Sequence, residues 1–429
     1  MKKIWKGLAV ACAFVLIAPL ASACDLFGGS QGSVKELSGE TLQSEYISWN
    51  GRNYYNETNE LNYFFYGNSG FTVDFYGTEL EATFYANNYD DGDPDDDNEE
   101  DDNVPNRPVF VVSVDNVLIA DNKIKLDKDA GKVVLDEAII KLSKNTLDPG
   151  TTNLHTVKLV SGLEEGAHTL TLYKMGEAKD NTTALKKIKT DNKFYKQTEN
   201  DKLKIEIIGS SGITGYGALS YSTSKDAGRN TENSFGALSL AGLTALMLNA
   251  DTSFMSVSGG VLCENIGGLS LQTIYDYTGR TNGQDGNGGI FKVNGQNVMY
   301  NHEQKMDIVI INMGGNDSQS ANLDTLQPQA VNAFTAKLLQ THPNATIVWT
   351  GRGNYGSRIS GAVNALNNPK VVYVGAIEGA GGSNTAQDPH YGANDHASIR
   401  TQLTNANMIL DKLATLGFQK QRTITIQEI

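Results

Sequence analysis

The stretch Ile205-Glu206-Ile207-Ile208-Gly209-Ser210-Ser211-Gly212-Ile213-Thr214-Gly215-Tyr216-Gly217 decides how the second half of the chain folds. Its apolar, β-branched start predicts a buried strand, and the small residues that follow predict a sharp turn. A serine on such a turn presents its hydroxyl at the carboxyl end of a parallel sheet, where open α/β folds place their sites. Because glycine- and serine-rich turns are common, this stretch alone indicates no more than a candidate nucleophile.

Downstream of this stretch, short apolar runs alternate with helical patterns. The predicted strands cover residues 205–208, 254–257, 308–311, 345–349 and 371–374, and the predicted helices cover 235–249, 329–340 and 396–416. In the last helix the apolar residues step by fours and threes and so share one face: Ile399, Leu403, Ala406, Leu410 and Leu413. This alternation predicts an α/β domain over residues 205–429, with a parallel sheet covered on both faces.

The first half of the chain has the alternation that is typical of strands. Polar residues alternate with apolar ones in the runs 71–75 and 80–84, which predicts a hairpin around Gly77. Similar runs cover residues 110–114, 133–135, 156–160 and 166–174, and no helical period is evident between residues 47 and 178. We therefore expect a β-sandwich over residues 41–185, and we interpret the lysine-rich segment 186–204 as the connection between two domains.

Residues 1–23 predict an export signal. Three lysines precede an apolar run, from Leu8 to Leu20, that is too short to span a bilayer comfortably. The motif Ala21-Ser22-Ala23-Cys24 resembles a bacterial lipobox, with Ala where Leu is usual. We expect Cys24 to carry a lipid anchor at the cell surface, followed by a flexible tether to residue 40; plain cleavage after Ala23, with an extracellular product, is the alternative.

The cysteine count and the net charge exclude some kinds of stabilisation and some partners. With Cys12 in the signal and Cys24 lipidated, Cys263 stands alone and no disulfide is expected. The net charge of −14 becomes −17 when the three signal lysines leave, and such an acidic surface excludes nucleic acid as a partner. Residues 90–102 hold ten carboxylates but lack the glycine and glutamate spacing of a calcium loop, so we interpret them as a solvated surface loop.

A serine nucleophile needs a base that takes its proton, and the base needs an orienting partner. Asp388-Pro389-His390 supplies both residue types late in the chain. Residues two apart in an extended segment can project toward one side, so Asp388 could hold the His390 ring and stabilise its charged form. A polar surface loop is the alternative interpretation of any isolated pair of this kind.

The third stretch, residues 308–317, again runs from a buried strand into glycines and then reaches Asn316. An amide N–H₂ group aimed at a developing oxyanion is the type of donor that acyl transfer needs. The alternative is that Asn316 is a turn residue and Asp317 caps a helix. Three strand ends that each carry a different catalytic group are much less expected by chance than one.

These motifs resemble, in order, the four blocks of the SGNH (GDSL-like) hydrolases: Gly209-Ser210-Ser211, Ser258-Gly259-Gly260, Gly314-Gly315-Asn316-Asp317 and Asp388-Pro389-His390. More narrowly, the chain resembles carbohydrate esterase family 2, of acetyl xylan esterase type. The resemblance implies an N-terminal jelly roll followed by a flavodoxin-like hydrolase domain. His396, six places after His390, fits the second histidine of that family's last block.

The resemblance also implies roles for individual residues. Ser211 would be the nucleophile, His390 the base and Asp388 its orienter. The oxyanion hole would consist of the Ser211 and Gly259 backbone N–H groups and the Asn316 side chain, with neither a cofactor nor a metal. The chain departs from the family pattern at three places: Ser210 stands where Asp is usual, Gly212-Ile213 replaces Ile-Thr, and Tyr391 follows the histidine where Pro is usual.

Three hypotheses about function follow. The first is an exported esterase that removes acetyl groups from a polysaccharide or oligosaccharide through a serine acyl-enzyme. The second is a carbohydrate-binding surface lipoprotein on the same scaffold without catalysis, motivated by Ser210 and Gly212. The third is a calcium-dependent adhesin that uses the acidic run. We favour the esterase, because a binding protein has no physical need for an acid, a base and an oxyanion donor that converge.

Overall fold

The computed structural model describes residues 34–88, 106–198, 200–263, 270–281, 289–319, 322–376 and 389–429. The predicted signal, Cys24, most of the tether, the acidic run 90–102 and Asp388 lie outside the described residues. The last part of the expected tether is structured, because Glu36–Ser38 forms a strand and Gly39–Gln43 forms a 3-10 helix.

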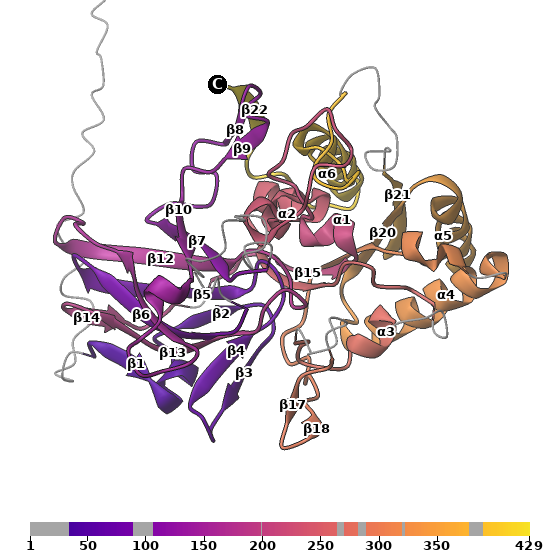
Figure 1. The fold of residues 1–429 in the computed structure, drawn as a ribbon. Helices are drawn as coiled ribbons and strands as arrows, with labels where there is room; N and C mark the ends of the chain where they lie inside the picture. The colour runs from indigo at the N-terminus through magenta and orange to yellow at the C-terminus, as the bar shows by residue number, and fades with distance from the viewer. Residues whose placement is uncertain are drawn as a thin grey trace, which may run out of the picture. The chain divides into compact units, whose positions relative to one another are not determined.

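Two antiparallel sheets form the first half of the chain (Figure 1). One has the order β11 (Leu154–Val160), β6 (Leu80–Ala86), β13 (Thr183–Thr190), β4 (Leu61–Phe64) and β3 (Asn53–Asn56), with β1 (Glu36–Ser38) also paired to β13. The other has the order β10 (Ala138–Lys141), β7 (Val109–Val114), β12 (Gly166–Lys174), β5 (Gly70–Gly77) and β14 (Lys193–Tyr195), with β2 (Ser48–Asn50) paired to β5.

The two antiparallel sheets enclose one apolar core. Phe84 of β6 and Phe110 of β7 come from different sheets and stack with ring centroids 4.7 Å apart. Phe64 of β4 packs against both rings, at 6.5 and 6.0 Å. In β5 the burial of side chains alternates from Phe71 to Gly77, as the period of two predicts for a sandwich strand.

The predicted hairpin around Gly77 is wrong. β5 pairs with β12, β14 and β2, whereas β6 pairs with β11 and β13, so the two strands lie in opposite sheets. The chain crosses between the sheets after Gly77, where Asp191 accepts hydrogen bonds from the Thr78 backbone N–H at 3.0 and 3.1 Å. Both apolar faces still reach the same core, which is why alternation alone could not tell the two arrangements apart.

The segment expected to connect two domains is also largely strand. β13 continues through Lys186 to Thr190, and β14 covers Lys193–Tyr195, both within the antiparallel sheets. The chain end contributes as well: β22 (Thr425–Glu428) pairs in parallel with β8 (Lys123–Asp127), which pairs with β9 (Lys132–Val134). These contacts belong to one compact unit over residues 34–429.

The second half contains a five-stranded parallel sheet with the order β16 (Asp251–Ser256), β15 (Lys204–Gly209), β19 (Ile308–Asn312), β20 (Thr346–Gly351) and β21 (Val371–Gly375). Every pairing in this sheet is parallel. All five predicted strands are confirmed. Counted along this half of the chain, the order 2-1-3-4-5 is that of flavodoxin-like sheets, whose ligands bind beyond the carboxyl ends of the strands.

Helices flank the parallel sheet (Figure 1). The main ones are α2 (Leu240–Leu248), α4 (Leu323–Thr341), α5 (Gly353–Leu366) and α6 (Ile399–Ala414), with shorter α1 (Ser211–Thr214) and α3 (Leu271–Ile274). α2 packs on α6, and α4 packs on α5. The sequence did not predict α5, because Gly353, Gly356 and Gly361 lower its helix propensity and its stability comes from packing on β20 and β21.

The remaining elements are the short strands β17 (Lys292–Val293) and β18 (Gln296–Asn297), and 3-10 turns at Lys144–Thr146, Thr231–Asn233, Gly236–Leu238 and Gly315–Gln319. Among the described residues, no helix combines the length and the apolar character that crossing a bilayer requires.

Candidate active site

Ser211 stands at the turn from β15 into α1. β15 ends at Gly209, Ser210 precedes the helix, and α1 begins at Ser211. The Ser210 backbone N–H donates to the Asn312 carbonyl oxygen at 3.2 Å, and a Cβ on Gly209 would lie 2.5 Å from the same oxygen. Glycine at position 209 therefore lets β15 and β19 approach closely, and Ser211 emerges at the carboxyl edge of the sheet.

Asn316 follows β19 at the same edge. Its side-chain amide donates to the Gly260 carbonyl oxygen at 3.0 Å, which joins it to the Ser258–Gly260 turn. Asp317 is fully buried and accepts hydrogen bonds from the Leu262 backbone N–H, at 2.9 Å, and from the Gln327 side chain, at 2.9 Å. Asp317, expected as a helix cap, is thus a buried link between the segment after the Ser258–Gly260 turn and α4.

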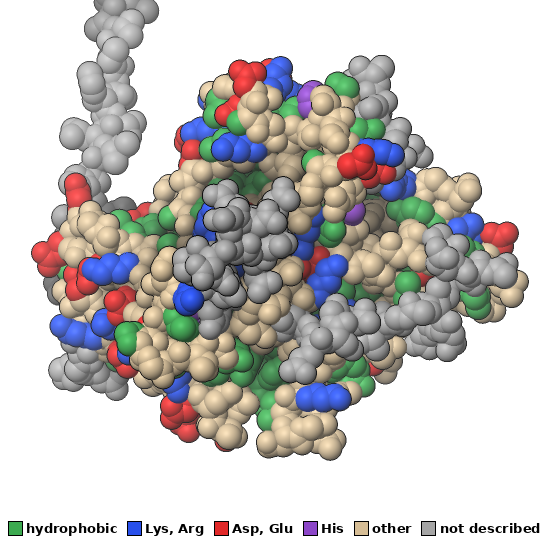
Figure 2. All heavy atoms as spheres, in the orientation of Figure 1, with side chains coloured by type: hydrophobic (Ala, Val, Ile, Leu, Met, Phe, Trp, Pro, Cys, Tyr) green, Lys and Arg blue, Asp and Glu red, His purple; other side chains and the backbone are tan. Residues whose placement is uncertain are grey.

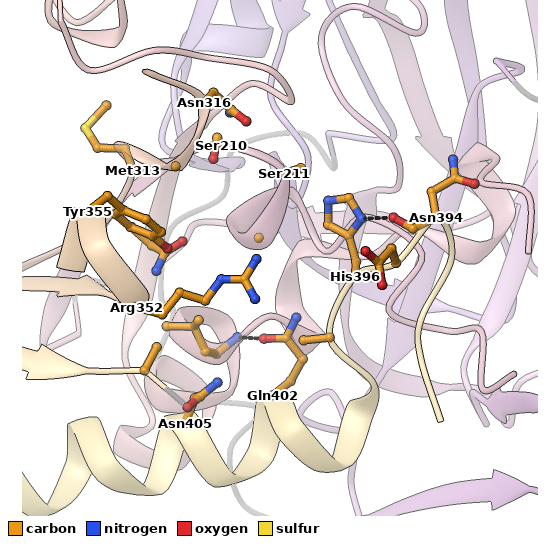
Figure 3. Close-up of a pocket in the computed structure, with 17 residues that line it drawn as sticks. Ser210, Ser211, Met313, Asn316, Arg352, Tyr355, Asn394, His396, Gln402 and Asn405 are labelled. Carbon is orange, nitrogen blue, oxygen red and sulfur yellow. Dashed lines mark hydrogen bonds between the residues drawn. The ribbon is translucent and has the colours of Figure 1, made fainter. Parts of the chain in front are cut away.

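A cavity of about 360 Å³ opens beside Ser211 (Figure 3). Its described lining residues are mostly polar: Ser210, Ser211, Gly212, Leu240, Asn312, Met313, Gly315, Asn316, Arg352, Tyr355, Ala376, Asn394, Asp395, His396, Ala397, Gln402 and Asn405. The structure therefore brings together the predicted nucleophile, the predicted amide donor and a histidine. That histidine is His396.

His390, the expected base, is not among the lining residues of this cavity. Its ring stacks on Tyr221, with centroids 4.0 Å apart and planes inclined by 10°. The backbone of the next residue, Tyr391, exchanges hydrogen bonds with Ser222 at 2.8 and 3.0 Å, which holds this segment against the loop after α1. Asp388 lies outside the described residues, so its expected role stays a prediction.

The His396 ring is held in one tautomer by its neighbours. Its Nδ1 atom lies 2.8 Å from the Asn394 backbone carbonyl oxygen (Figure 3). Because a carbonyl can only accept, Nδ1 carries the proton and Nε2 keeps a lone pair. The His396 ring also stacks on Tyr216, at 4.4 Å and 26°. Burial lowers the pKa of His396 below its ordinary 6.5, and the nearby Arg352 charge acts in the same direction, so the neutral form is favoured.

The signal for His396 was present but differs from the expected pattern. In Asn394-Asp395-His396-Ala397-Ser398, the position two before the histidine is an amide residue, so a search for Asp-x-His passes over it. The ring is oriented by a backbone carbonyl, and that requirement leaves no side-chain signature. Ser398 caps α6 by accepting from the Thr401 backbone N–H at 3.3 Å, which fixes where the segment enters the helix.

Gly259, the other expected oxyanion donor, has φ of 78° in the turn after β16. It does not appear among the residues that line the cavity, although its neighbour Gly260 contacts Asn316. Cys263 is buried; burial and the Asp317 carboxylate raise the pKa of its thiol to about 12, which disfavours the thiolate form.

A second titratable cluster lies away from this cavity. Glu206, His302 and His342 place possible metal-ligand atoms within 4.8 Å of one another. However, Arg52 from the sandwich half already donates to Glu206 at 2.9 Å, and both side chains are fully buried. Burial alone would raise the pKa of Glu206, but the His342 hydrogen bond and the Arg52 charge lower it to about 2. A buried guanidinium beside the carboxylate opposes a divalent cation there, so we interpret this cluster as an ion-pair network.

Comparison with known proteins supports the same scaffold. No model of a protein family matches the chain. The cellulase/esterase CelE of Acetivibrio thermocellus is 29% identical over 276 residues, which are 61% of this chain and 32% of the relative. The chain thus spans about a third of the length of the curated relative that it matches.

Solved structures extend the match to nearly the whole chain. A family two carbohydrate esterase from Clostridium thermocellum, in complex with cellohexaose, has a TM-score of 0.64 and 24% identity over 87% of this chain and 99% of its own. The chain has the fold of the family two carbohydrate esterases. An acetyl xylan esterase from Butyrivibrio proteoclasticus gives a TM-score of 0.64 at 17% identity, over 90% of this chain and all of its own. The resemblance predicted from the motifs is confirmed at the level of the fold.

Proposed function

We propose that the protein is an esterase that hydrolyses acetyl or other short acyl esters on a polysaccharide or oligosaccharide. The observation that carries this proposal is the convergence of Ser211, Asn316 and His396 on one cavity. Each comes from a different strand end or loop, and together they supply a nucleophile, an oxyanion donor and a base. The family two carbohydrate esterase fold supports the same reaction class.

The reaction would begin with Ser211. Nε2 of His396 takes the Oγ proton while Oγ attacks the ester carbonyl carbon, and the C–O bond to the sugar breaks as the imidazolium returns the proton to the leaving alkoxide. The Asn394 carbonyl holds Nδ1–H throughout and stabilises the charged ring. Water, deprotonated by the same Nε2, then attacks the acyl-enzyme carbonyl carbon. The bond to Ser211 Oγ breaks, the carboxylic acid leaves, and the imidazolium returns the proton to Oγ.

The oxyanion would be held by donors at the sheet edge. Asn316 Nδ2 has two N–H donors and uses one on Gly260, which leaves the second for the oxyanion. The Ser211 backbone N–H, at the first residue of α1, is the second proposed donor, and Gly259 N–H remains the third. For the general base and its orienting residue, the sequence-based alternative remains His390 with Asp388. The cavity lining favours His396 as the base.

Sugar hydroxyl groups would meet the polar part of the lining. Three polar residues line the cavity on the side opposite Ser210 and Asn316 (Figure 3): Arg352, Gln402 and Asn405. Gln402 is held in place because its Oε1 accepts from the Leu240 backbone N–H at 2.8 Å. On the face shown in Figure 2, the described acidic and basic side chains are intermixed, so a neutral glycan is a better match there than a polyanion.

A carbohydrate-binding protein without catalysis is the second candidate. The observation that favours it is Ser210, which stands where the family has Asp and makes no side-chain cap of α1. Under this alternative, glycan binding would survive Ser211→Ala and the wild-type protein would release no acetate.

The remaining predictions from the sequence belong to this proposal. They are export by residues 1–23, lipid anchoring through Cys24, a cell-surface or extracellular location, jelly-roll connectivity of the sandwich, and a hydrolase domain over residues 205–429. A cellular fractionation with and without Cys24→Ala tests the anchor: the variant would move from the membrane fraction to the medium.

Acetate release from acetylated xylan or mannan tests the proposed activity. The wild-type protein would release acetate, and Ser211→Ala would reduce the rate to background. Ser210→Ala is the matched control, because it alters the neighbouring hydroxyl in the same turn and leaves Oγ of Ser211 in place. Equal rates from the wild type and Ser211→Ala would overturn the proposal.

A further inference from the structure

A buried charged cluster lies between the sandwich and the candidate active site. Glu177 and Asp180 follow β12 and have exposed fractions of 0% and 3%. Arg229 donates to both Asp180 oxygens, at 2.6 and 2.5 Å, and lies 3.5 Å from Glu177 Oε1. The Glu177 backbone N–H donates to Asp180 Oδ2 at 2.8 Å, so all three residues are linked to one another. We call Glu177, Asp180 and Arg229 the Arg229 cluster.

One side of the Arg229 cluster holds the Ser258–Gly260 turn, which carries the proposed oxyanion donor Gly259. Glu177 Oε2 accepts a hydrogen bond from the Ser258 backbone N–H at 2.6 Å. Ser258 precedes Gly259, and the following residue, Gly260, accepts from the Asn316 amide at 3.0 Å. A hydrogen bond to a buried carboxylate is short and strong. Glu177 therefore fixes the peptide next to the Gly259 N–H and, through Gly260, the orientation of Asn316.

The other side of the Arg229 cluster reaches the base. The Arg229 guanidinium carbon lies 5.0 Å from the centroid of the Tyr216 ring, within the range of a cation–π contact. The same Tyr216 ring stacks on His396 at 4.4 Å. Asn394, whose carbonyl accepts from His396 Nδ1, also donates its side-chain amide to the Tyr216 hydroxyl at 3.3 Å. The position of Arg229 thus restricts Tyr216, and Tyr216 restricts the imidazole.

We propose that Glu177 and Arg229 are positioning residues for catalysis, so that the sandwich sets the geometry of the hydrolase site without touching the reacting ester. The inference rests on the proposed esterase function. It has a physical reason in the sensitivity of catalysis to placement, since a shift of about 1 Å can cost on the order of 10² in rate. Glu177 acts on the oxyanion side, and Arg229 acts on the base side.

Steady-state kinetics of Glu177 variants test the first half. Glu177→Ala would lower kcat by about 10- to 100-fold, below the loss of a complete oxyanion donor, with KM changed by less than about two-fold. Glu177→Gln would recover most of kcat, because its amide oxygen can still accept from Ser258 N–H. Glu232→Gln is the matched control: Glu232 pairs with Arg107 and Lys141 of the sandwich, and its loss would leave kcat unchanged.

The outcomes separate this inference from the proposed function. A wild-type protein that releases no acetate overturns the proposed function and, with it, the inference. A wild-type protein that is active, with Glu177→Ala equally active or with Glu232→Gln equally impaired, overturns the inference alone. Circular dichroism of every variant at the assay temperature ensures that only folded protein is compared.

The base side is tested by Arg229→Lys, which keeps a positive charge next to Asp180 but loses the planar guanidinium over Tyr216. The readout is the His396 Cε1–H resonance in NMR, which the Tyr216 ring current shifts as long as the two rings stack. We expect the resonance to move toward the position of an unstacked histidine, together with a several-fold lower kcat. An unchanged His396 resonance and an unchanged kcat would overturn the role of Arg229.

Discussion

The Nδ1 atom of His396 lies 2.8 Å from the backbone carbonyl oxygen of Asn394, and the ring lines the same cavity as Ser211. A carbonyl at this position does what a carboxylate does in a serine triad, since it fixes the tautomer and the ring plane. The orienting atom itself carries no negative charge; burial lowers the pKa of His396 and outweighs the nearby Asp395 carboxylate, which favours the charged ring. This relationship is the basis of the proposed serine–histidine pair, whose histidine is held by the main chain.

The choice of base can be tested by two alanine substitutions. His396→Ala would lower kcat for an acetyl ester by about 10²- to 10⁴-fold, the usual contribution of general base catalysis. His390→Ala removes a ring that stacks on Tyr221, so it would lower the thermal midpoint and leave kcat within a few-fold of the wild type. Comparison of the two kcat values under one condition decides between them. A large loss in His390→Ala with an active His396→Ala would restore the prediction from Asp388-Pro389-His390.

Removal of the Asn394 side chain tests the role of its carbonyl. Asn394 has φ of 47°, a left-handed backbone that glycine adopts without strain, so Asn394→Gly keeps the carbonyl in place. We expect kcat within about five-fold of the wild type, whereas removing the base itself costs on the order of 10² or more. Kinetics of Asn394→Gly and His396→Ala in parallel provide the measurement. A loss in Asn394→Gly as large as in His396→Ala would show that the side chain orients the ring.

The pH dependence follows from the burial of His396. Burial lowers the pKa of this ring below 6.5, and Nε2 must be neutral to take the serine proton. The acid limb of log kcat/KM against pH would therefore have its midpoint below 6.5, and the activity would be lost as the pH falls through that midpoint. A midpoint clearly above 6.5 would mean that a carboxylate raises the pKa of the base, as Asp388 would.

The buried pair of Arg52 and Glu206 makes a prediction about stability. Removing one member leaves an uncompensated charge in the interior, so Arg52→Met would lower the free energy of unfolding by about 3–5 kcal/mol. Replacing both, in Arg52→Met with Glu206→Gln, would recover part of this loss because no buried charge remains. Urea unfolding of the two variants measures both values. A double variant less stable than Arg52→Met would contradict this electrostatic account.

The parallel sheet could be predicted because its strands contain continuous apolar runs, as in Ile308–Asn312. Such runs between helical patterns are typical of strands buried on both faces of a parallel sheet. The placement of Ser211 and Asn316 beside one cavity could be predicted because each comes a few residues after such a strand. The role now proposed for His396 as the base could not be predicted, since its orienting partner is a backbone atom. The strands that pair with β5 and β6 could not be predicted either. Alternation indicates which face of a strand is buried, but not which strand lies alongside.

The same limit explains the other misses. α5 contains three glycines and is stabilised by its contacts with β20 and β21. β22 is a short polar strand that pairs with β8, about three hundred residues earlier in the chain. Local propensity carries no information about either contact, because both are formed only when distant segments have already folded.

The central claim is that Ser211 is a nucleophile activated by His396, and its direct test is covalent modification by a fluorophosphonate followed by mass mapping of the modified peptide. The account predicts modification of Ser211 in the wild type, none at this position in Ser211→Ala, and a rate at least about 10²-fold lower in His396→Ala. Modification of Ser211 at the same rate in the wild type and in His396→Ala, or no modification of the wild type, would contradict it.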